Sequence, residues 1–324
     1  GRVKESSVRV LVAGGAGFIG SHLCESLLHS GFDVVAVDNL ITGRLHNISS
    51  LLEHPRFTFR QHDITEPLDL EVDAVFHLAS PASPVGYRRY SIETHLVNSI
   101  GTLHLLELAR RLNARFLFAS TSEVYGDPEV HPQPETYHGN VNPVGPRSCY
   151  DESKRFGESL TMEFVRKYGL DARIVRIFNT YGPRTDPDDG RVVPNFVLRA
   201  LRGEPLVVYG DGRQTRSLCY VSDMVRGIRL AMERDGLAGE VINLGNPDER
   251  TVLDLAQLVL ELTGSSSSIT FAPPRPDDPI RRCPDIAKAR RLLNWEPKVS
   301  LLDGLRLTIA YFAETLDHAP AAGE

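Results

Sequence analysis

The chain has 324 residues, of which 41% are hydrophobic and 24% are charged, and its formal net charge at pH 7 is −6. These values describe a globular protein with room for one large domain or two unequal ones. The negative charge gives no electrostatic reason to expect nucleic acid or a membrane surface as a partner. No apolar run reaches membrane-spanning length and no signal-peptide pattern appears, so we expect a cytoplasmic protein, although an anchor removed from a longer precursor would be invisible here.

The cysteines show neither CxxC nor metal-ligand spacing. This pattern predicts reduced thiols in a reducing compartment, and no metal site is expected. The four positions are Cys24, Cys149, Cys219 and Cys283.

A glycine-rich turn follows the first apolar run. Residues 8–13 predict a strand, and Gly14-Gly15-Ala16-Gly17-Phe18-Ile19-Gly20 leads from it into a helical pattern. In a strand, glycine turn and helix of this kind, the backbone N–H groups at the start of the helix bind a pyrophosphate. Gly14 and Gly17 would allow close approach of the phosphates, with Phe18 and Ile19 beside them, and Gly20 would allow the helix to pack on the strand.

The second predicted strand, residues 33–37, ends at Asp38. A carboxylate at this position accepts hydrogen bonds from an adenosine ribose and repels a 2′-phosphate, which favours NAD over NADP. Arg44 follows a few residues later and is able to hold a 2′-phosphate, so the sequence favours NAD without ruling out NADP. Asn39, Thr42 and Gly43 would line the adenosine.

Further strands are predicted at residues 57–62, 74–80, 115–119 and 173–178, with a helix around 98–111. Asp63 and Ile64 follow the third strand and would cap the adenine, whereas Leu78 and Ser80 would face the cofactor. Alternating strands and helices predict an α/β fold with a doubly wound parallel (Rossmann) sheet, whose ligand lies at the carboxyl ends of the strands.

The pattern changes after Tyr181, where turn residues become frequent and the alternation ends. We expect residues 1–180 to form the nucleotide-binding domain, with 217–244 returning to it. Residues 181–216 and 245–317 would form a smaller C-terminal substrate-binding lobe, and 318–324 a frayed tail.

Tyr150 and Lys154 stand four residues apart, so they share one face of a helix. The ammonium would lie beneath the phenol and lower its pKa, which makes the tyrosine a base. If Thr121 donates a hydrogen bond to the oxygen that Tyr150 deprotonates, the three side chains form a device for oxidising a secondary alcohol.

These features together resemble the extended short-chain dehydrogenase/reductase family over essentially the whole chain. The family usually has a glycine where Asn294 stands, and both residues suit a turn. The resemblance is carried by the three glycines, Asp38, Asp63, the Tyr150/Lys154 pair and Leu293-Asn294-Trp295-Glu296-Pro297. Within the family the chain is most similar to the UDP-glucuronate decarboxylases, in residues 78–84, 121–128, 145–152 and 176–184.

The resemblance implies roles for individual residues. Tyr150 and Lys154 would be base and support, with Lys154 also on the nicotinamide ribose, while Thr121, Ser122 and Glu123 would lie at the sugar. Arg282 would lie near the reacting sugar, and Arg191 among the phosphates on the cofactor side. The substrate-binding residues would be Tyr87, Asn179, Val193, Asn195, Phe196, Tyr209, Arg216 and Arg282.

The implied reaction is the NAD-dependent decarboxylation of UDP-glucuronate to UDP-xylose. Oxidation at C4 places a ketone β to the C6 carboxylate, CO2 leaves, and C4 is reduced again, so there is no net redox change. The family also implies a homodimer through helices that flank the sheet.

Two alternatives stay open. A nucleotide-sugar 4,6-dehydratase also begins with C4 oxidation, but its elimination step needs a carboxylic acid where this chain has Ser122, a far weaker acid. A non-catalytic NAD(H)-sensing protein would be expected to lack the tyrosine, lysine or threonine, and all three are present.

Overall fold

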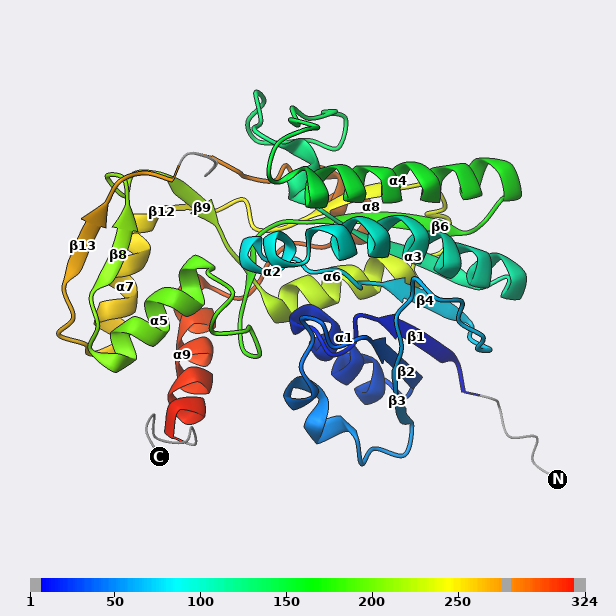
Figure 1. Ribbon diagram of the computed structural model, residues 1–324, viewed down its shortest axis with the longest axis horizontal. Coiled ribbons are helices and arrows are strands. Elements are labelled where there is room, and N and C mark those ends of the chain that lie inside the picture. The colour runs from blue at the N-terminus through cyan, green and yellow to red at the C-terminus, as the bar shows by residue number, and fades with distance from the viewer. Residues whose placement is uncertain (1–6, 276–280, 318–324) are drawn as a thin grey trace.

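The computed structural model describes residues 7–275 and 281–317, and the predicted frayed tail at 318–324 lies outside them. A seven-stranded parallel sheet forms the centre of the larger lobe, in the order β11-β6-β5-β4-β1-β2-β3 (Figure 1). This order confirms the predicted doubly wound α/β fold. The strands are β1 (Arg9–Ala13), β2 (Asp33–Asp38), β3 (Phe57–Gln61), β4 (Ala74–His77), β5 (Arg115–Thr121), β6 (Ala172–Ile177) and β11 (Val241–Leu244).

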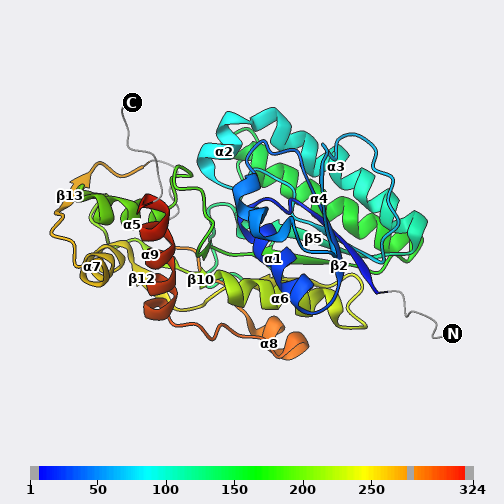
Figure 2. The same ribbon diagram turned by 90° about the horizontal axis from the view of Figure 1, so that it is seen from below.

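Helices cover both faces of the sheet. Val10 and Val12 of β1 point into the core beneath α1 (Phe18–His29) and α6 (Val221–Glu233), whereas Leu11 and Ala13 point into the core beneath α3 (Ser91–Leu112) and α4 (Ser148–Tyr168). Figure 2 shows the two helix layers on opposite sides. Because side chains alternate between two buried faces, the strands read as continuous apolar runs in the sequence.

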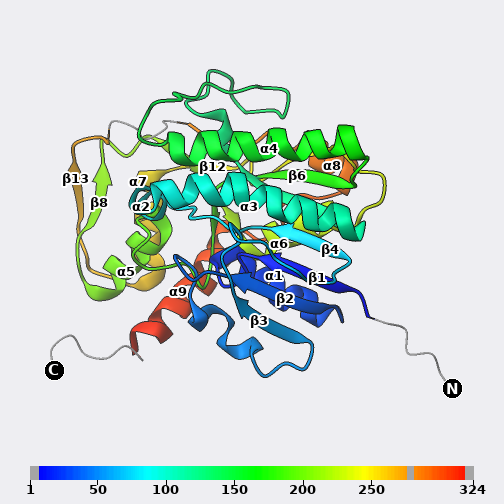
Figure 3. The same ribbon diagram turned by 45° about the vertical axis from the view of Figure 1, so that its right-hand side comes forward.

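The smaller lobe lies beyond the carboxyl ends of the strands (Figures 1 and 3). Strands β8 and β13 pair in parallel, and β9 and β12 pair antiparallel. The lobe consists of α5 (Val192–Arg202), β8 (Leu206–Tyr209), β9 (Thr215–Ser217), β12 (Glu249–Thr251), α7 (Val252–Thr263), β13 (Ile269–Ala272) and α9 (Leu301–Asp317).

Short elements complete the described chain. Asn294 ends α8 in the left-handed conformation with φ 48°, which explains why it stands where the family usually has a glycine. These elements are η1 (Leu45–Leu51), α2 (Pro84–Arg89), η2 (Ser122–Tyr125), β7 (Thr180–Tyr181), β10 (Cys219–Tyr220) and α8 (Ala287–Leu293). Within the described residues, none of the helices is long and apolar enough to cross a membrane.

Residues 221–244 run back from the smaller lobe to the sheet. They supply α6 and then β11, which pairs with β6 at the edge of the sheet. They fall within residues 217–244, the stretch for which a return to the first domain is predicted, and the domain boundaries themselves stay a prediction.

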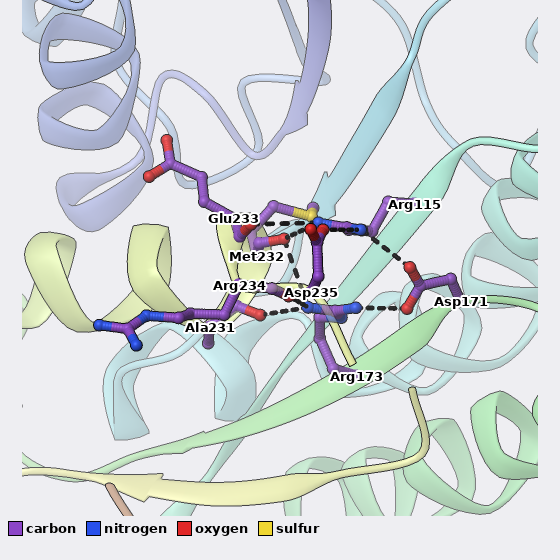
Figure 4. Close-up of polar contacts among 8 residues, drawn as sticks. All are labelled: Arg115, Asp171, Arg173, Ala231, Met232, Glu233, Arg234 and Asp235. Carbon is purple, nitrogen blue, oxygen red and sulfur yellow. Dashed lines mark hydrogen bonds and ion pairs between the residues drawn. The ribbon is translucent and has the colours of Figure 1, made fainter. Parts of the chain in front are cut away.

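A buried arginine fixes α6 to the sheet (Figure 4). The Arg173 guanidinium donates hydrogen bonds to the carbonyl oxygens of Ala231, at 2.8 Å, and Arg234, at 2.6 Å, and to the Asp171 carboxylate. Arg115 donates to the same carboxylate at 2.8 Å. The last carbonyls of a helix have no partner within it, so these cations satisfy the C-terminus of α6 and interact favourably with its dipole.

Candidate active site

A cavity of about 980 Å³ lies between the carboxyl ends of the strands and the smaller lobe. A second pocket of about 60 Å³ adjoins it beside the first two strands. The two share the glycine turn and the ends of neighbouring strands in their walls, so they form one continuous site. The shared residues are Gly14, Gly17, Ile41, Thr42, Gly43, Leu78 and Ser80.

The glycine turn has no space for side chains. Gly14 has φ +84°, and a Cβ there would lie 2.5 Å from the Leu78 carbonyl oxygen. A Cβ on Gly20 would lie 2.0 Å from the Gly14 carbonyl oxygen. Since α1 starts at Phe18 and both Phe18 and Ile19 line the cavity, the N-terminus of this helix opens into the site. This geometry fits a pyrophosphate.

Asp38 lies at the carboxyl end of β2, in the wall of the smaller pocket. Its carboxylate accepts hydrogen bonds from the backbone N–H groups of Leu40, at 2.8 Å, and Ala16, at 3.1 Å. Burial raises its pKa. The other residues predicted at the adenosine and beside the cofactor also line this pocket, namely Asn39, Thr42, Gly43, Asp63, Ile64, Leu78 and Ser80.

Tyr150 and Lys154 lie on one helix, α4, and both are buried in the wall of the large cavity. The Lys154 ammonium donates a hydrogen bond to the Ala119 carbonyl oxygen at 2.9 Å and lies 5.8 Å from the centre of the Tyr150 ring. Tyr87 stacks on that ring with 4.9 Å between centroids and an interplanar angle of 7°. The phenol is therefore held in one orientation.

The predicted lowering of the Tyr150 pKa by Lys154 is wrong for the polypeptide itself. Burial raises the pKa of Tyr150 to about 12, and hydrogen bonding with Thr121 opposes this rise without cancelling it. Burial also lowers the pKa of Lys154 to about 7, which weakens it as a fixed cation. Helical spacing correctly predicts that Tyr150 and Lys154 are neighbours on α4. It does not predict how deeply both side chains are buried, and burial dominates both pKa values.

Glu123 and Arg282 form an ion pair at the same end of the cavity, although they are 159 residues apart in the chain. Arg282 also donates to the Gly126 carbonyl oxygen at 2.7 Å. Thr121 ends β5, and its hydroxyl accepts a hydrogen bond from the Glu123 N–H at 3.1 Å. Ser122 lines the cavity between them.

His131, Glu249 and Cys283 form a cluster of potential metal ligands near Arg282. The carboxylate of Glu249 already receives hydrogen bonds from His131, at 2.7 Å, and Arg281, at 3.1 Å. A carboxylate bound to a guanidinium is a weak metal ligand, so we interpret the cluster as an ion-pair network that anchors the segment carrying Arg282.

Four arginines in the cavity wall each leave one buried guanidinium nitrogen without a hydrogen-bond partner among the residues that the structure describes. Buried guanidinium N–H groups are normally satisfied, so these arginines fit anionic ligands such as phosphates and carboxylates. The four are Arg44, Arg147, Arg184 and Arg282. Arg147 and Arg184 were missed as site residues, and the signal that could have found them was their position inside the two runs, 145–152 and 176–184, that carry the resemblance.

Seven of the eight residues predicted to bind substrate line the cavity, as does Arg191. They are Tyr87, Asn179, Asn195, Phe196, Tyr209, Arg216 and Arg282. Val193 is the exception, because its side chain is buried in the hydrophobic core. Sequence reasoning also missed Arg275, whose guanidinium lies 3.9 Å from the centre of the Tyr209 ring.

Comparison with known proteins places the chain in a family. Residues 10–245 match the model of the NAD dependent epimerase/dehydratase family. UDP-glucuronic acid decarboxylase 1 of Danio rerio is 53% identical over 310 residues, which cover 96% of this chain and 74% of the relative. UDP-glucuronic acid decarboxylase 1 of Arabidopsis thaliana is 54% identical over 94% of this chain and 70% of the relative.

Solved structures agree with this placement. UDP-glucuronic acid 4-epimerase from Bacillus cereus, in complex with UDP-glucuronic acid and NAD, is 33% identical, with a TM-score of 0.85 over 95% of this chain and 100% of that one. UDP-glucose 4-epimerase from Thermotoga maritima is 37% identical, with a TM-score of 0.85 over the same shares. This chain therefore belongs to the NAD-dependent epimerase/dehydratase family.

Proposed function

We propose that this chain is a carboxy-lyase that converts UDP-glucuronate to UDP-xylose with tightly held NAD. The observation that carries this proposal is the match, over 96% of the chain, with UDP-glucuronic acid decarboxylases at more than half identity. The site supports it, because a tyrosine base, a hydroxyl donor and an arginine face one cavity of about 980 Å³.

Tyr150 would remove the proton of the sugar 4-hydroxyl, with Thr121 bonded to the same oxygen. When bound, NAD supplies the oxidation of C4 and its reversal, and its positive charge favours the phenolate that burial disfavours. Lys154 would hold the nicotinamide ribose. The stacked Tyr87 ring keeps the phenol oriented, so little reorganisation is needed during the reaction.

Decarboxylation would proceed from the 4-keto sugar, whose carbonyl accepts the electrons left by CO2. The hydroxyls of Thr121 and Tyr150 would stabilise the negative oxygen that develops. Arg282 would orient the departing carboxylate, but its guanidinium is shared with Glu123. A shared cation holds the carboxylate loosely, and this avoids stabilising the ground state more than the transition state.

The remaining predicted contacts follow the two halves of the site. The glycine turn, Asp38 and the residues of the smaller pocket would bind the cofactor, with Arg191 beside its phosphates. The nucleotide diphosphate of the substrate would lie against the smaller lobe, where Asn195, Phe196, Tyr209 and Arg216 line the cavity, with Asn179 beyond the end of β6.

Product analysis tests the proposed activity. Purified protein with NAD⁺ and UDP-glucuronate is expected to release one CO2 for each UDP-xylose formed, without net accumulation of reduced cofactor. Conversion of UDP-glucose or dTDP-glucose to a 4-keto-6-deoxy sugar would instead establish a 4,6-dehydratase. Binding of NAD(H) without turnover of any of these substrates would establish a sensing protein.

We also propose a homodimer through α3 and α4. Ile92, Leu96, Ile100 and Leu103 are 38 to 70% exposed and recur along one side of α3, and Phe156 is exposed on the neighbouring α4. Apolar side chains repeated at three- and four-residue spacing on exposed helices are typical of an interface between subunits.

The four buried, unpaired cysteines support a reducing compartment such as the cytoplasm.

Replacing both Ile100 and Leu103 with Glu is expected to convert the dimer to a monomer, because the buried charges would lose hydration without gaining partners. Light scattering coupled to size exclusion should then give the chain mass of 35.9 kDa instead of about twice that value. Leu307→Glu is the matched control, since Leu307 is also an exposed apolar residue but lies on α9, and it should leave the mass unchanged. An unaltered mass in the double variant would refute this interface.

A further inference from the structure

Arg282 reaches the cavity from a stretch between β13 and α8, residues 281–286, that forms neither helix nor strand. Two of its guanidinium nitrogens are occupied, because Nη1 pairs with Glu123 and Nη2 donates to the Gly126 carbonyl oxygen at 2.7 Å. Its Nε is buried and has no hydrogen-bond partner among the described residues. Nε is therefore a donor left for an anionic ligand, and its direction depends on how the surrounding backbone is held.

Gln133 is fully buried and binds the backbone that follows Arg282. Its N–H donates to the Cys283 carbonyl oxygen at 2.9 Å, and its side-chain Oε1 accepts a hydrogen bond from the Cys283 N–H at 3.1 Å. Its carbonyl oxygen accepts from the Asp285 N–H at 3.0 Å, and its Nε2 donates to the Val130 carbonyl oxygen at 2.7 Å. Both polar atoms of the side chain are thus used, which holds the amide in one orientation.

The loop that carries Gln133 also holds the residue before Arg282. His131 is hydrogen-bonded to the Glu249 carboxylate at 2.7 Å, and Arg281 donates to the same carboxylate at 3.1 Å. The residues before and after Arg282 are therefore both fixed, one by a shared carboxylate and the other by direct hydrogen bonds to Gln133.

Asn243 connects this arrangement to the sheet. It is fully buried on β11, and its Nδ2 donates to the Gln133 carbonyl oxygen at 2.9 Å. Its Oδ1 accepts a hydrogen bond from the Tyr125 hydroxyl at 2.7 Å, and Tyr125 belongs to η2, the short helix that carries Glu123. Both sides of the ion pair at the sugar end of the cavity are thus built on one hydrogen-bonded frame.

Gln133 does not line the cavity, whereas Arg282 does, so an effect of Gln133 on a bound sugar is transmitted by the arginine. We propose, on the basis of the proposed decarboxylase function, that Gln133 is a positioning residue that fixes Arg282 so that Nε meets the C6 carboxylate of the sugar. A displacement of about 1 Å at a reacting group can cost about 10²-fold in rate. The step affected is the loss of CO2, because oxidation at C4 uses other residues of the site.

Gln133→Met tests this proposal, because methionine keeps much of the volume but removes both polar atoms of the side chain. We expect CO2 release to slow roughly 10- to 100-fold, with KM for UDP-glucuronate changed less than about threefold. In a single turnover, reduced cofactor should appear at the wild-type rate and then persist, because C4 is oxidised normally while decarboxylation is slow.

Thr308→Val is the control for the loss of a buried side-chain hydrogen bond. Thr308 is fully buried on α9, where its hydroxyl donates to the Gly304 carbonyl oxygen at 2.8 Å. Its variant should release CO2 at the wild-type rate and show no persistent reduced cofactor. A wild-type course of cofactor reduction and reoxidation in Gln133→Met would overturn the inference.

A double-mutant cycle separates positioning from a purely structural role. When Arg282→Met is already present, adding Gln133→Met should slow CO2 release by less than about twofold, because there is no guanidinium left to position. The same fold-change with and without Arg282 would overturn the inference, since the effect of Gln133 would then not pass through this arginine.

Arg281→Met keeps the inference testable even where Gln133→Met does not fold. The Arg281 side chain is 55% exposed, so its replacement leaves the core intact. Reduced cofactor should persist in this variant too, with a smaller fall in CO2 release, and a wild-type course would overturn the inference. Failure of the wild-type protein to release CO2 would instead overturn the proposed function, and with it this role of Gln133.

Discussion

Tyr150→Phe is expected to lower kcat with UDP-glucuronate by about 10³-fold or more while NAD affinity stays within about twofold. The substitution removes only the oxygen that would take the 4-hydroxyl proton and later stabilise the enolate. The phenyl ring keeps its stacking on Tyr87, and Lys154 keeps its hydrogen bond to Ala119. Steady-state rates of UDP-xylose formation and a titration with NAD would measure the two effects separately.

Tyr168→Phe is the matched control for this experiment. Tyr168 lies on the same helix but is exposed at its far end, so its phenol has no place in the proposed chemistry. Its variant should retain wild-type turnover. If Tyr150→Phe kept more than about a tenth of the activity, another group would have to be the base.

Arg173→Met is expected to lower the free energy of unfolding by roughly 2–5 kcal/mol, because two carbonyl oxygens at the end of α6 lose their donor, at about 1–3 kcal/mol each. Arg173 is fully buried, and its guanidinium satisfies both the Asp171 carboxylate and the carbonyl oxygens that end α6 (Figure 4). Methionine fills much of the space but takes this donor away from the Ala231 and Arg234 carbonyl oxygens, while Asp171 keeps its hydrogen bond from Arg115. Denaturant unfolding of both proteins, compared at equal slope, would give the difference.

Arg166→Met provides the contrast, because Arg166 pairs with Glu163 on the exposed surface of α4. Exposed pairs contribute less than about 1 kcal/mol, so its unfolding midpoint should hardly move. Equal effects of the two substitutions would show that the Arg173 network adds no more stability than a surface pair.

The sheet and its nucleotide site could be predicted from the sequence because both are encoded locally. The inner strands are buried on two faces and therefore read as apolar runs, with only small errors at the ends, as at β4, which stops at His77. The edge strand β3 is mostly exposed and alternates instead. The glycine spacing depends on backbone geometry within seven residues, and the structure shows the close contact that Gly14 and Gly20 require.

The electrostatics of the site could not be predicted in the same way. The pKa of Tyr150 depends on burial by elements far apart in the chain, including Tyr87 from α2, and spacing along α4 carries no information about it. The Glu123–Arg282 pair joins residues 159 positions apart, so only the family resemblance suggested that they meet. Val193 stays a prediction: the motif gives its place on α5, and the structure packs its side chain in the hydrophobic core.

The edge strand β11 affects how the protein forms during synthesis. Because β11 comes from residues 241–244, the sheet is incomplete until three quarters of the 324 residues have been synthesised and have left the ribosome. Until then β6 exposes an unpaired row of backbone N–H and C=O groups, and Arg173 has no α6 carbonyls to bind. The nascent chain thus carries an unpaired edge strand that is prone to aggregation. A nonsense mutation that truncates the chain near residue 180 would therefore yield an aggregating fragment instead of an independent nucleotide-binding domain.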